Sequence, residues 1–339
     1  MKYKHFQAFA QLFSVSHTRF ALPFLVPLRR LCYNILNTIP RRLLMLCTLC
    51  PRRCGAVRTA DEGRGFCQLP ETMLIARIQP HLWEEPPISG TRGTGAIFFS
   101  GCTLRCAYCQ NGDISHRNAG RPFTPSGLAD SMRRLVDAGM HTLSFITATP
   151  HVHGVLEAVN LYKQRWNDCP PLVWNTSGYE TVETLRLLDG VIDVYLPDLK
   201  HRSEAMGRLC AKAPDYFDVT AAAITEMVRQ TGTPVYDAEG IMTRGTLIRH
   251  LILPGLTSES VRLLDWVAEN LPGIPVSLMR QYIPMNGVDI KGLDRPITER
   301  EYRRVRDHMI ALDLPGFLQE PESASTDFVP LFCQDESYI

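Results

Sequence analysis

The sequence lacks the features that would mark a membrane-spanning, secreted or repetitive protein. Its apolar run ALPFLVPL, residues 21–28, is too short to span a bilayer and is interrupted by Pro23 and Pro27. No small-residue cleavage site accompanies this run, which disfavours a secretory signal. We find no internal repeat and no low-complexity tract. Because the net charge is only +1, we expect no nucleic-acid partner, and we expect no stable insertion into a membrane.

Carboxylates are missing from the start of the chain. Residues 1–60 contain ten Lys and Arg but no Asp or Glu, and the first carboxylate is Asp61. Because Met45 lies two residues before the first motif cysteine, Cys47, we expect translation to begin there. Residues 1–44 would then be a basic extension that is disordered or not translated. An Arg-rich, acid-free start is also typical of organelle-targeting or membrane-surface segments, and this alternative stays open.

Cysteine, by contrast, is abundant and clustered. Seven of the eleven cysteines fall into two groups with short spacings. Secreted chains pair their cysteines as disulfides, whereas closely spaced cysteines in an intracellular enzyme more often bind metal. We therefore expect a cytoplasmic protein, in a reducing compartment, whose two cysteine groups are metal ligands.

The pattern from residue 91 onward predicts an α/β fold. Short apolar runs alternate with amphipathic helical patterns, which is typical of a parallel sheet covered by helices. The six predicted strands are residues 96–100, 142–147, 171–175, 191–196, 246–253 and 275–282. Six units are too few for a closed eight-unit barrel, so we predict an open, partial TIM-like barrel over residues 91–310. A cysteine-rich segment, residues 45–90, precedes the barrel, and a tail, residues 311–339, follows it.

Local signals support parts of this outline. Thr124 is placed to cap a helix that has Pro125 in its first turn and ends at Gly139. Thr298 and Glu301 have the spacing of a capping box. The sequence of residues 232–245 predicts an irregular or hairpin insertion before the fifth strand.

The stretch GCTLRCAYCQN, residues 101–111, places three cysteines directly after the first predicted strand. Reactive groups collect at the carboxyl ends of parallel strands, so we expect Cys102, Cys106 and Cys109 on a loop above the mouth of the barrel. Thiolates suit iron–sulfur clusters and zinc. Four cysteines saturate a four-iron cluster, so three leave one iron open to bind a substrate. A zinc site and unrelated thiols are the alternatives.

This triplet resembles the CxxxCxxC signature of radical S-adenosylmethionine enzymes, with the aromatic Tyr108 before its last cysteine. The resemblance implies a [4Fe–4S] cluster held by Cys102, Cys106 and Cys109, with S-adenosylmethionine chelating the open iron. It also implies that reductive cleavage of the sulfonium yields methionine and a 5′-deoxyadenosyl radical, which abstracts a hydrogen atom from the substrate.

Further stretches narrow the resemblance to one subgroup. HLWEEPPISGTRGTGAIFFSGC, CQNGDIS, NTSGYE, DVYLPDLKH and RHLILPG resemble the relatives of the pyruvate formate-lyase activating enzyme, over roughly residues 45–310. This implies a partial (β/α)6 TIM-like barrel, in agreement with the six predicted strands. It also implies a glycyl-radical enzyme as the protein substrate and an electron donor such as flavodoxin or ferredoxin.

The resemblance also places cofactor contacts at strand ends. Where the superfamily usually has a Gly-Gly-Glu-like turn, this chain has TATPH, which departs from the family pattern. By position, the resemblance implies cofactor contacts from Tyr108, Thr147, Thr149, Asn175, Ser177, Asp198, Lys200, Arg249 and His250. The alternative for each is a structural salt bridge or a helix cap, and Asp198 with Lys200 can simply form an ion pair.

The earlier cysteine group has the spacing Cys47-x2-Cys50-x3-Cys54-x12-Cys67. Four thiols suit a structural zinc ion or a saturated auxiliary iron–sulfur cluster, because they leave no position open. We therefore predict a second metal site here and assign it no chemistry. A redox-active or merely buried set of cysteines is the alternative.

Three functions are consistent with these patterns. The first is a radical S-adenosylmethionine enzyme that activates a glycyl-radical enzyme. The second is a radical enzyme that acts on a small molecule. The third is a non-catalytic iron–sulfur or zinc scaffold, which has no use for the unsaturated cluster that three cysteines predict.

Overall fold

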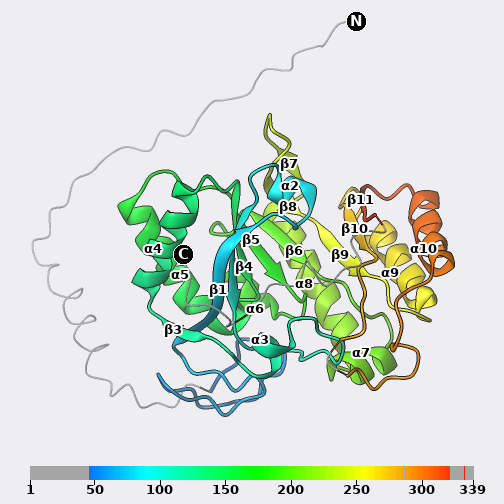
Figure 1. Cartoon of the computed structure of the whole chain (residues 1–339), viewed down its shortest axis with the longest axis horizontal. Helices are drawn as coiled ribbons and strands as arrows, with labels where there is room; N and C mark the ends of the chain where they lie inside the picture. The colour runs from blue at the N-terminus through cyan, green and yellow to red at the C-terminus, as the bar shows by residue number, and fades with distance from the viewer. Residues whose placement is uncertain (1–45, 286, 321–331, 333–339) are drawn as a thin grey trace, which may run out of the picture. The chain divides into compact units, whose positions relative to one another are not determined.

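A computed structural model describes residues 46–285 and 287–320 together with Phe332 (Figure 1). The expectations for residues 1–44 lie outside the described residues, as does most of the predicted tail. None of the described helices is long and apolar enough to cross a membrane.

Six parallel strands form the centre of the fold and confirm the predicted α/β architecture. They are β2 (Thr94–Phe99), β4 (Thr142–Ile146), β5 (Leu172–Thr176), β6 (Val194–Pro197), β9 (Ile248–Leu251) and β10 (Val276–Met279). The first four pair in that order, and β9 pairs with β10. A parallel bridge between Asp198 and Arg249 links the two sets. The result is the partial TIM-like barrel that the sequence predicts.

Three strands extend this arc beyond the prediction. β1 (Met73–His81) pairs antiparallel with β2, and β3 (Arg121–Phe123) pairs with the outer side of β1. β11 (Gly316–Leu318) pairs in parallel with β10. The register of β1 shifts between Ile75 and Arg77, and this irregularity breaks the alternation of apolar and polar residues by which a strand is recognised.

The predicted insertion before the fifth strand is a hairpin. β7 (Val235–Tyr236) pairs antiparallel with β8 (Met242–Thr246), which confirms the prediction for residues 232–245. The end of β8 pairs with β6, and only Leu247 separates β8 from β9. The chain therefore passes from the hairpin directly into the barrel.

Helices pack against both faces of the arc (Figure 1). They are α2 (Pro86–Ser89), α3 (Gly112–His116), α4 (Pro125–Asp137), α5 (Val152–Arg165), α6 (Val182–Arg186), α7 (Glu204–Ala211), α8 (Tyr216–Thr231), α9 (Thr257–Asn270) and α10 (Glu299–Ala311), with a 3-10 turn, η1 (Thr149–His151), before α5. The Thr124 side chain caps α4, and Thr298 and Glu301 form the predicted capping box at α10.

The main core lies between the sheet and helices α4 and α5. Phe145 on β4 is fully buried, and its ring lies 6.4 Å from that of Phe99 and 6.3 Å from that of Trp174. Burial of large apolar side chains is the dominant favourable contribution to folding. This core holds β2, β4 and β5 in place and thereby sets the positions of the loops at their carboxyl ends.

Truncation of this core will destabilise the fold. We expect Phe145→Ala to lower the free energy of unfolding by about 3–5 kcal/mol, because the loss of a buried aromatic ring leaves a cavity. Leu209→Ala is the matched control, since Leu209 is 54% exposed, and we expect a change within about 0.5 kcal/mol. Denaturant unfolding measures both values, and equal losses would contradict the assignment of the core.

Candidate active site

One cavity lies at the carboxyl ends of the parallel strands. All three cysteines of the CxxxCxxC motif line it, on the loop that follows β2. Seven of the nine predicted cofactor contacts line the same cavity: Tyr108 from the cysteine loop, and Thr147, Asn175, Ser177, Asp198, Lys200 and Arg249 from β4, β5, β6 and β9 or the residues that directly follow them. The structure therefore brings together residues that are up to 147 positions apart in the sequence, from Cys102 to Arg249.

The cysteine loop begins with a turn that requires glycine. Gly101 has a φ of +81°, and a Cβ atom there would lie 2.4 Å from the Leu69 side chain. The segment that follows is neither helix nor strand, as predicted. Two backbone hydrogen bonds hold it: the Ala107 N–H donates to the Cys210 carbonyl at 2.8 Å, and the Cys109 N–H donates to the Cys106 carbonyl at 3.1 Å.

The three motif cysteines are free thiols that bound iron could keep deprotonated. None of the nine described cysteines forms a disulfide. Burial raises the pKa of Cys106, and the neighbouring Cys102 and Cys109 raise it further, although Lys200 opposes them. The Ser115 hydroxyl donates to the sulfur of Cys109 at 3.3 Å. Bound iron would supply the charge that these sulfurs need to be thiolates, so the donor set fits an iron–sulfur cluster.

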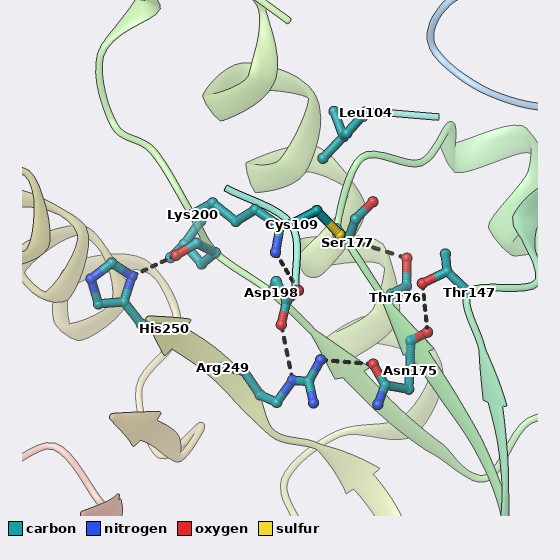
Figure 2. A network of polar contacts seen from close by, with 12 residues as sticks. Leu104, Cys109, Thr147, Asn175, Thr176, Ser177, Asp198, Lys200, Arg249 and His250 are labelled. Atoms are coloured by element: carbon teal, nitrogen blue, oxygen red, sulfur yellow. Dashed lines mark hydrogen bonds and ion pairs between the residues drawn. The ribbon is translucent and has the colours of Figure 1, made fainter. Parts of the chain in front are cut away.

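A largely buried charge network lines the same cavity (Figure 2). Arg249 Nε donates to Asp198 Oδ1 at 2.9 Å, and Arg249 Nη2 donates to Asn175 Oδ1 at 2.8 Å. Lys200 Nζ donates to the other oxygen of Asp198, so these two residues form an ion pair, which was the structural alternative to cofactor binding. Burial alone would raise the pKa of Asp198, but Arg249 and Lys200 outweigh it and lower the pKa below its usual value.

Glu84 completes this network and was not among the predicted site residues. Its side chain is 8% exposed and accepts hydrogen bonds from Arg249 Nη1 at 3.2 Å and from Asn175 Nδ2 at 3.0 Å. It lies on the loop between β1 and α2, within the quoted motif HLWEEPPISG. An acidic residue next to prolines was the available signal, but only the fold shows that it meets Arg249.

Tyr108 and Ser177 both line the cavity, but only the Tyr108 hydroxyl has a hydrogen-bond partner among the described residues. The Tyr108 hydroxyl lies 3.1 Å from His201 Nε2, and its ring packs edge-on against Tyr282. Ser177 is 7% exposed, and its hydroxyl has no hydrogen-bond partner among the described residues. Thr147 donates to the Asn175 carbonyl at 3.3 Å. Ser177 is therefore a polar group that a bound ligand would satisfy, as is Asn111, whose side-chain oxygen also lacks a partner among the described residues.

Two predicted cofactor contacts do not line the cavity, which corrects their expected placement. Thr149 donates to Glu180 Oε1 at 3.0 Å and is buried outside the cavity. Successive side chains of a strand point to opposite faces, so His250 points away from the face that Arg249 occupies (Figure 2). Its ring nitrogens contact the Leu199 carbonyl at 2.6 Å and the Ser260 hydroxyl at 2.8 Å, and burial lowers its pKa to about 4.

The four earlier cysteines gather in one segment. Burial raises the pKa of Cys50 to about 12, the Arg52 backbone N–H opposes this, and Cys67, Cys47 and Cys54 raise it further. Among the described residues, no three His, Cys, Asp or Glu side chains are placed to hold a single metal ion. The second metal site therefore stays a prediction.

Residues 96–267, just over half of the chain, match the radical SAM superfamily. The chain therefore belongs to this superfamily. An uncharacterized protein of Methanocaldococcus jannaschii is 28% identical over a 277-residue alignment that covers 78% of this chain and 75% of that protein.

Two solved structures are also similar to the chain. A radical SAM methyltransferase from Sphaerobacter thermophilus aligns at 13% identity with a TM-score of 0.47, over 66% of this chain and 65% of that one, so the chain spans just under two thirds of its length. A spore photoproduct lyase mutant aligns at 12% identity with a TM-score of 0.45, over 71% of this chain and 79% of that one.

Membership in the superfamily establishes the cofactors. Radical SAM proteins use a [4Fe–4S] cluster together with S-adenosylmethionine, and the cavity holds both the soft sulfur donors for the cluster and polar groups for the nucleotide. Neither the family match nor the similar proteins support the narrower subgroup of the pyruvate formate-lyase activating enzyme.

The charge network will be costly to break. We expect Asp198→Ala to lower the free energy of unfolding by about 3–5 kcal/mol, because it leaves the largely buried Lys200 without its carboxylate and Arg249 with only that of Glu84. The matched control is Arg208→Ala, which removes an exposed ion pair with Glu204 and is expected to cost about 0–1 kcal/mol. Denaturant unfolding of the two variants measures the difference, and similar costs would show that the network is not a buried one.

Proposed function

We propose that Cys102, Cys106 and Cys109 hold the [4Fe–4S] cluster and that the cavity beside them binds S-adenosylmethionine. The observation that carries this proposal is that one cavity is lined both by the three sulfurs and by polar side chains from four strand ends. When bound, the cluster supplies the electron that cleaves the sulfonium into methionine and a 5′-deoxyadenosyl radical.

The chain's own residues would orient the nucleotide. Ser177 offers a buried hydroxyl without a partner, while Asn175, Arg249 and Asp198 form a rigid polar wall through their mutual hydrogen bonds. Apolar side chains, Leu104, Ile114, Ile146, Met279 and Ile283, line the rest of the cavity. Such a wall excludes water from a reactive radical, and preorganised polar groups position the ligand at little entropic cost.

We further propose that the hydrogen donor is a glycine Cα–H on a partner protein, as in glycyl-radical activating enzymes. The sheet is an open arc: among the described residues, its edge strands β3 and β11 do not pair with one another. An open barrel leaves a side through which a partner's loop can enter. An electron donor such as flavodoxin or ferredoxin would supply the reducing electron.

Removal of one cluster ligand tests the cysteine assignment. We expect Cys106→Ala to reduce 5′-deoxyadenosine formation from S-adenosylmethionine, under anaerobic conditions with dithionite, to the level without protein. Cys169→Ser is the matched control, because Cys169 is outside both cysteine groups, and it should retain the wild-type rate. A wild-type rate in Cys106→Ala with unchanged folding would refute the assignment.

The nature of the hydrogen donor is tested separately. We expect the reconstituted protein to generate a glycine-centred radical, detected by electron paramagnetic resonance (EPR), on a purified glycyl-radical enzyme. A partner with that glycine changed to alanine is the control and should give no radical. Uncoupled formation of 5′-deoxyadenosine without a protein radical would instead favour a small-molecule substrate.

A further inference from the structure

The two cysteine groups contact each other through a pair of reciprocal arginine–carbonyl contacts. Arg52 lies between Cys50 and Cys54, and its Nε donates to the carbonyl of Thr103 at 2.8 Å, within the CxxxCxxC loop. In the opposite direction, Arg105 of that loop donates from Nη2 to the carbonyl of Cys67 at 3.4 Å. Each motif therefore provides a cation that binds the backbone of the other.

A phenylalanine between the two arginines strengthens this contact. The Arg52 guanidinium lies 4.0 Å from the centre of the Phe66 ring, and the Arg105 guanidinium lies 5.7 Å from it. Both distances allow cation–π attraction. Because Phe66 immediately precedes Cys67, the ring anchors the fourth cysteine of the earlier group next to the loop.

Additional hydrogen bonds extend the contact on both sides. Arg52 Nη2 donates to the Ala211 carbonyl at 3.0 Å, and Arg105 Nη2 donates to Gln68 Oε1 at 3.2 Å. Asn118 Nδ2, which follows α3, donates to the Cys67 carbonyl at 2.9 Å. In Figure 1 the earlier segment, drawn in blue, lies at the same end of the fold as α3. Hydrogen bonds from charged donors are stronger than neutral ones, so the arginines dominate this interface.

The CxxxCxxC loop needs such support because its own backbone provides little. It has no regular secondary structure, and Arg105 holds a left-handed φ of +56°. Side chains outside the immediate ligands commonly fix the orientation of metal-binding groups, and loss of that support weakens a site. The arginine contacts supply this support from the earlier cysteine segment.

We propose that Arg52 and Arg105 are positioning residues that couple the earlier cysteine segment to the loop carrying Cys102, Cys106 and Cys109. Stabilisation of either segment then stabilises the other, because a coupling free energy acts equally in both directions. This proposal rests on the proposed function for its catalytic consequence, whereas the coupling itself is a property of the folded chain.

Amide hydrogen exchange on the full-length anaerobic protein, before and after cluster reconstitution, tests the coupling. The variants are Arg52→Gln, Arg105→Gln and the double variant. Arg64→Gln is the matched control, since Arg64 lies in the same segment with its side chain 87% exposed. The reporting amides are Ala107, which donates to the Cys210 carbonyl of α7, and Cys109, which donates to the Cys106 carbonyl within the loop.

In the double variant we expect exchange at these two amides to rise at least about tenfold, which corresponds to a loss of about 1.4 kcal/mol. The amides of Cys47 and Gln68, hydrogen-bonded in the earlier segment, should also exchange faster. The double variant should bind less iron on reconstitution, and its EPR spectrum should respond less to S-adenosylmethionine. Arg64→Gln and the amides of β4 and β5 should remain as in wild type.

Two results would overturn the proposal. One is unchanged exchange at Ala107 and Cys109 in the double variant. The other is a uniform rise that includes β4 and β5, because the arginines would then serve the fold as a whole. If the double variant does not fold, the two single variants provide the same comparison. If wild-type protein shows no EPR response to S-adenosylmethionine, the proposed function fails, yet the exchange data still decide the coupling.

Discussion

The contact between Asp198 and Arg249 is the constraint on which the site depends. Their backbones form the bridge between β6 of the larger sheet and β9 of the three-stranded sheet, and their side chains pair at 2.9 Å. The Leu199 N–H also donates to the Arg249 carbonyl at 2.8 Å. Without this junction the polar strand ends would not face the cysteine loop across one cavity. Because the two side chains are largely buried, loss of either charge would leave the other without this partner and destabilise the junction.

The fold was predictable where local pattern and tertiary structure agree. The six parallel strands are short apolar runs, and their burial on both faces explains why these runs are nearly continuous. β1 was not predicted, because its register shift interrupts the alternation of apolar and polar residues and because the strand contains Pro80. β11 is only three residues long, which is too short for a periodic signal.

The site residues that belong to a sequence motif were predictable. Residues whose role depends on the direction of the side chain or on long-range packing were less so. The spacing of the three cysteines was sufficient to place them on one loop. Arg249 and His250 are adjacent in sequence, but the strand directs only one of them into the cavity. Glu84 and the arginine contacts between the cysteine groups depend on long-range packing, which no local pattern reports. Residues that support a site are thus harder to predict than the ligands themselves.

The central claim is that one iron of the cluster stays open for S-adenosylmethionine. The most direct test is pulsed EPR of the anaerobically reduced protein with the nucleotide labelled by nitrogen-15 in its amino group. The account predicts a hyperfine coupling between that nitrogen and the cluster. Absence of this coupling with full cluster occupancy, or a fourth protein ligand on the remaining iron, would contradict it.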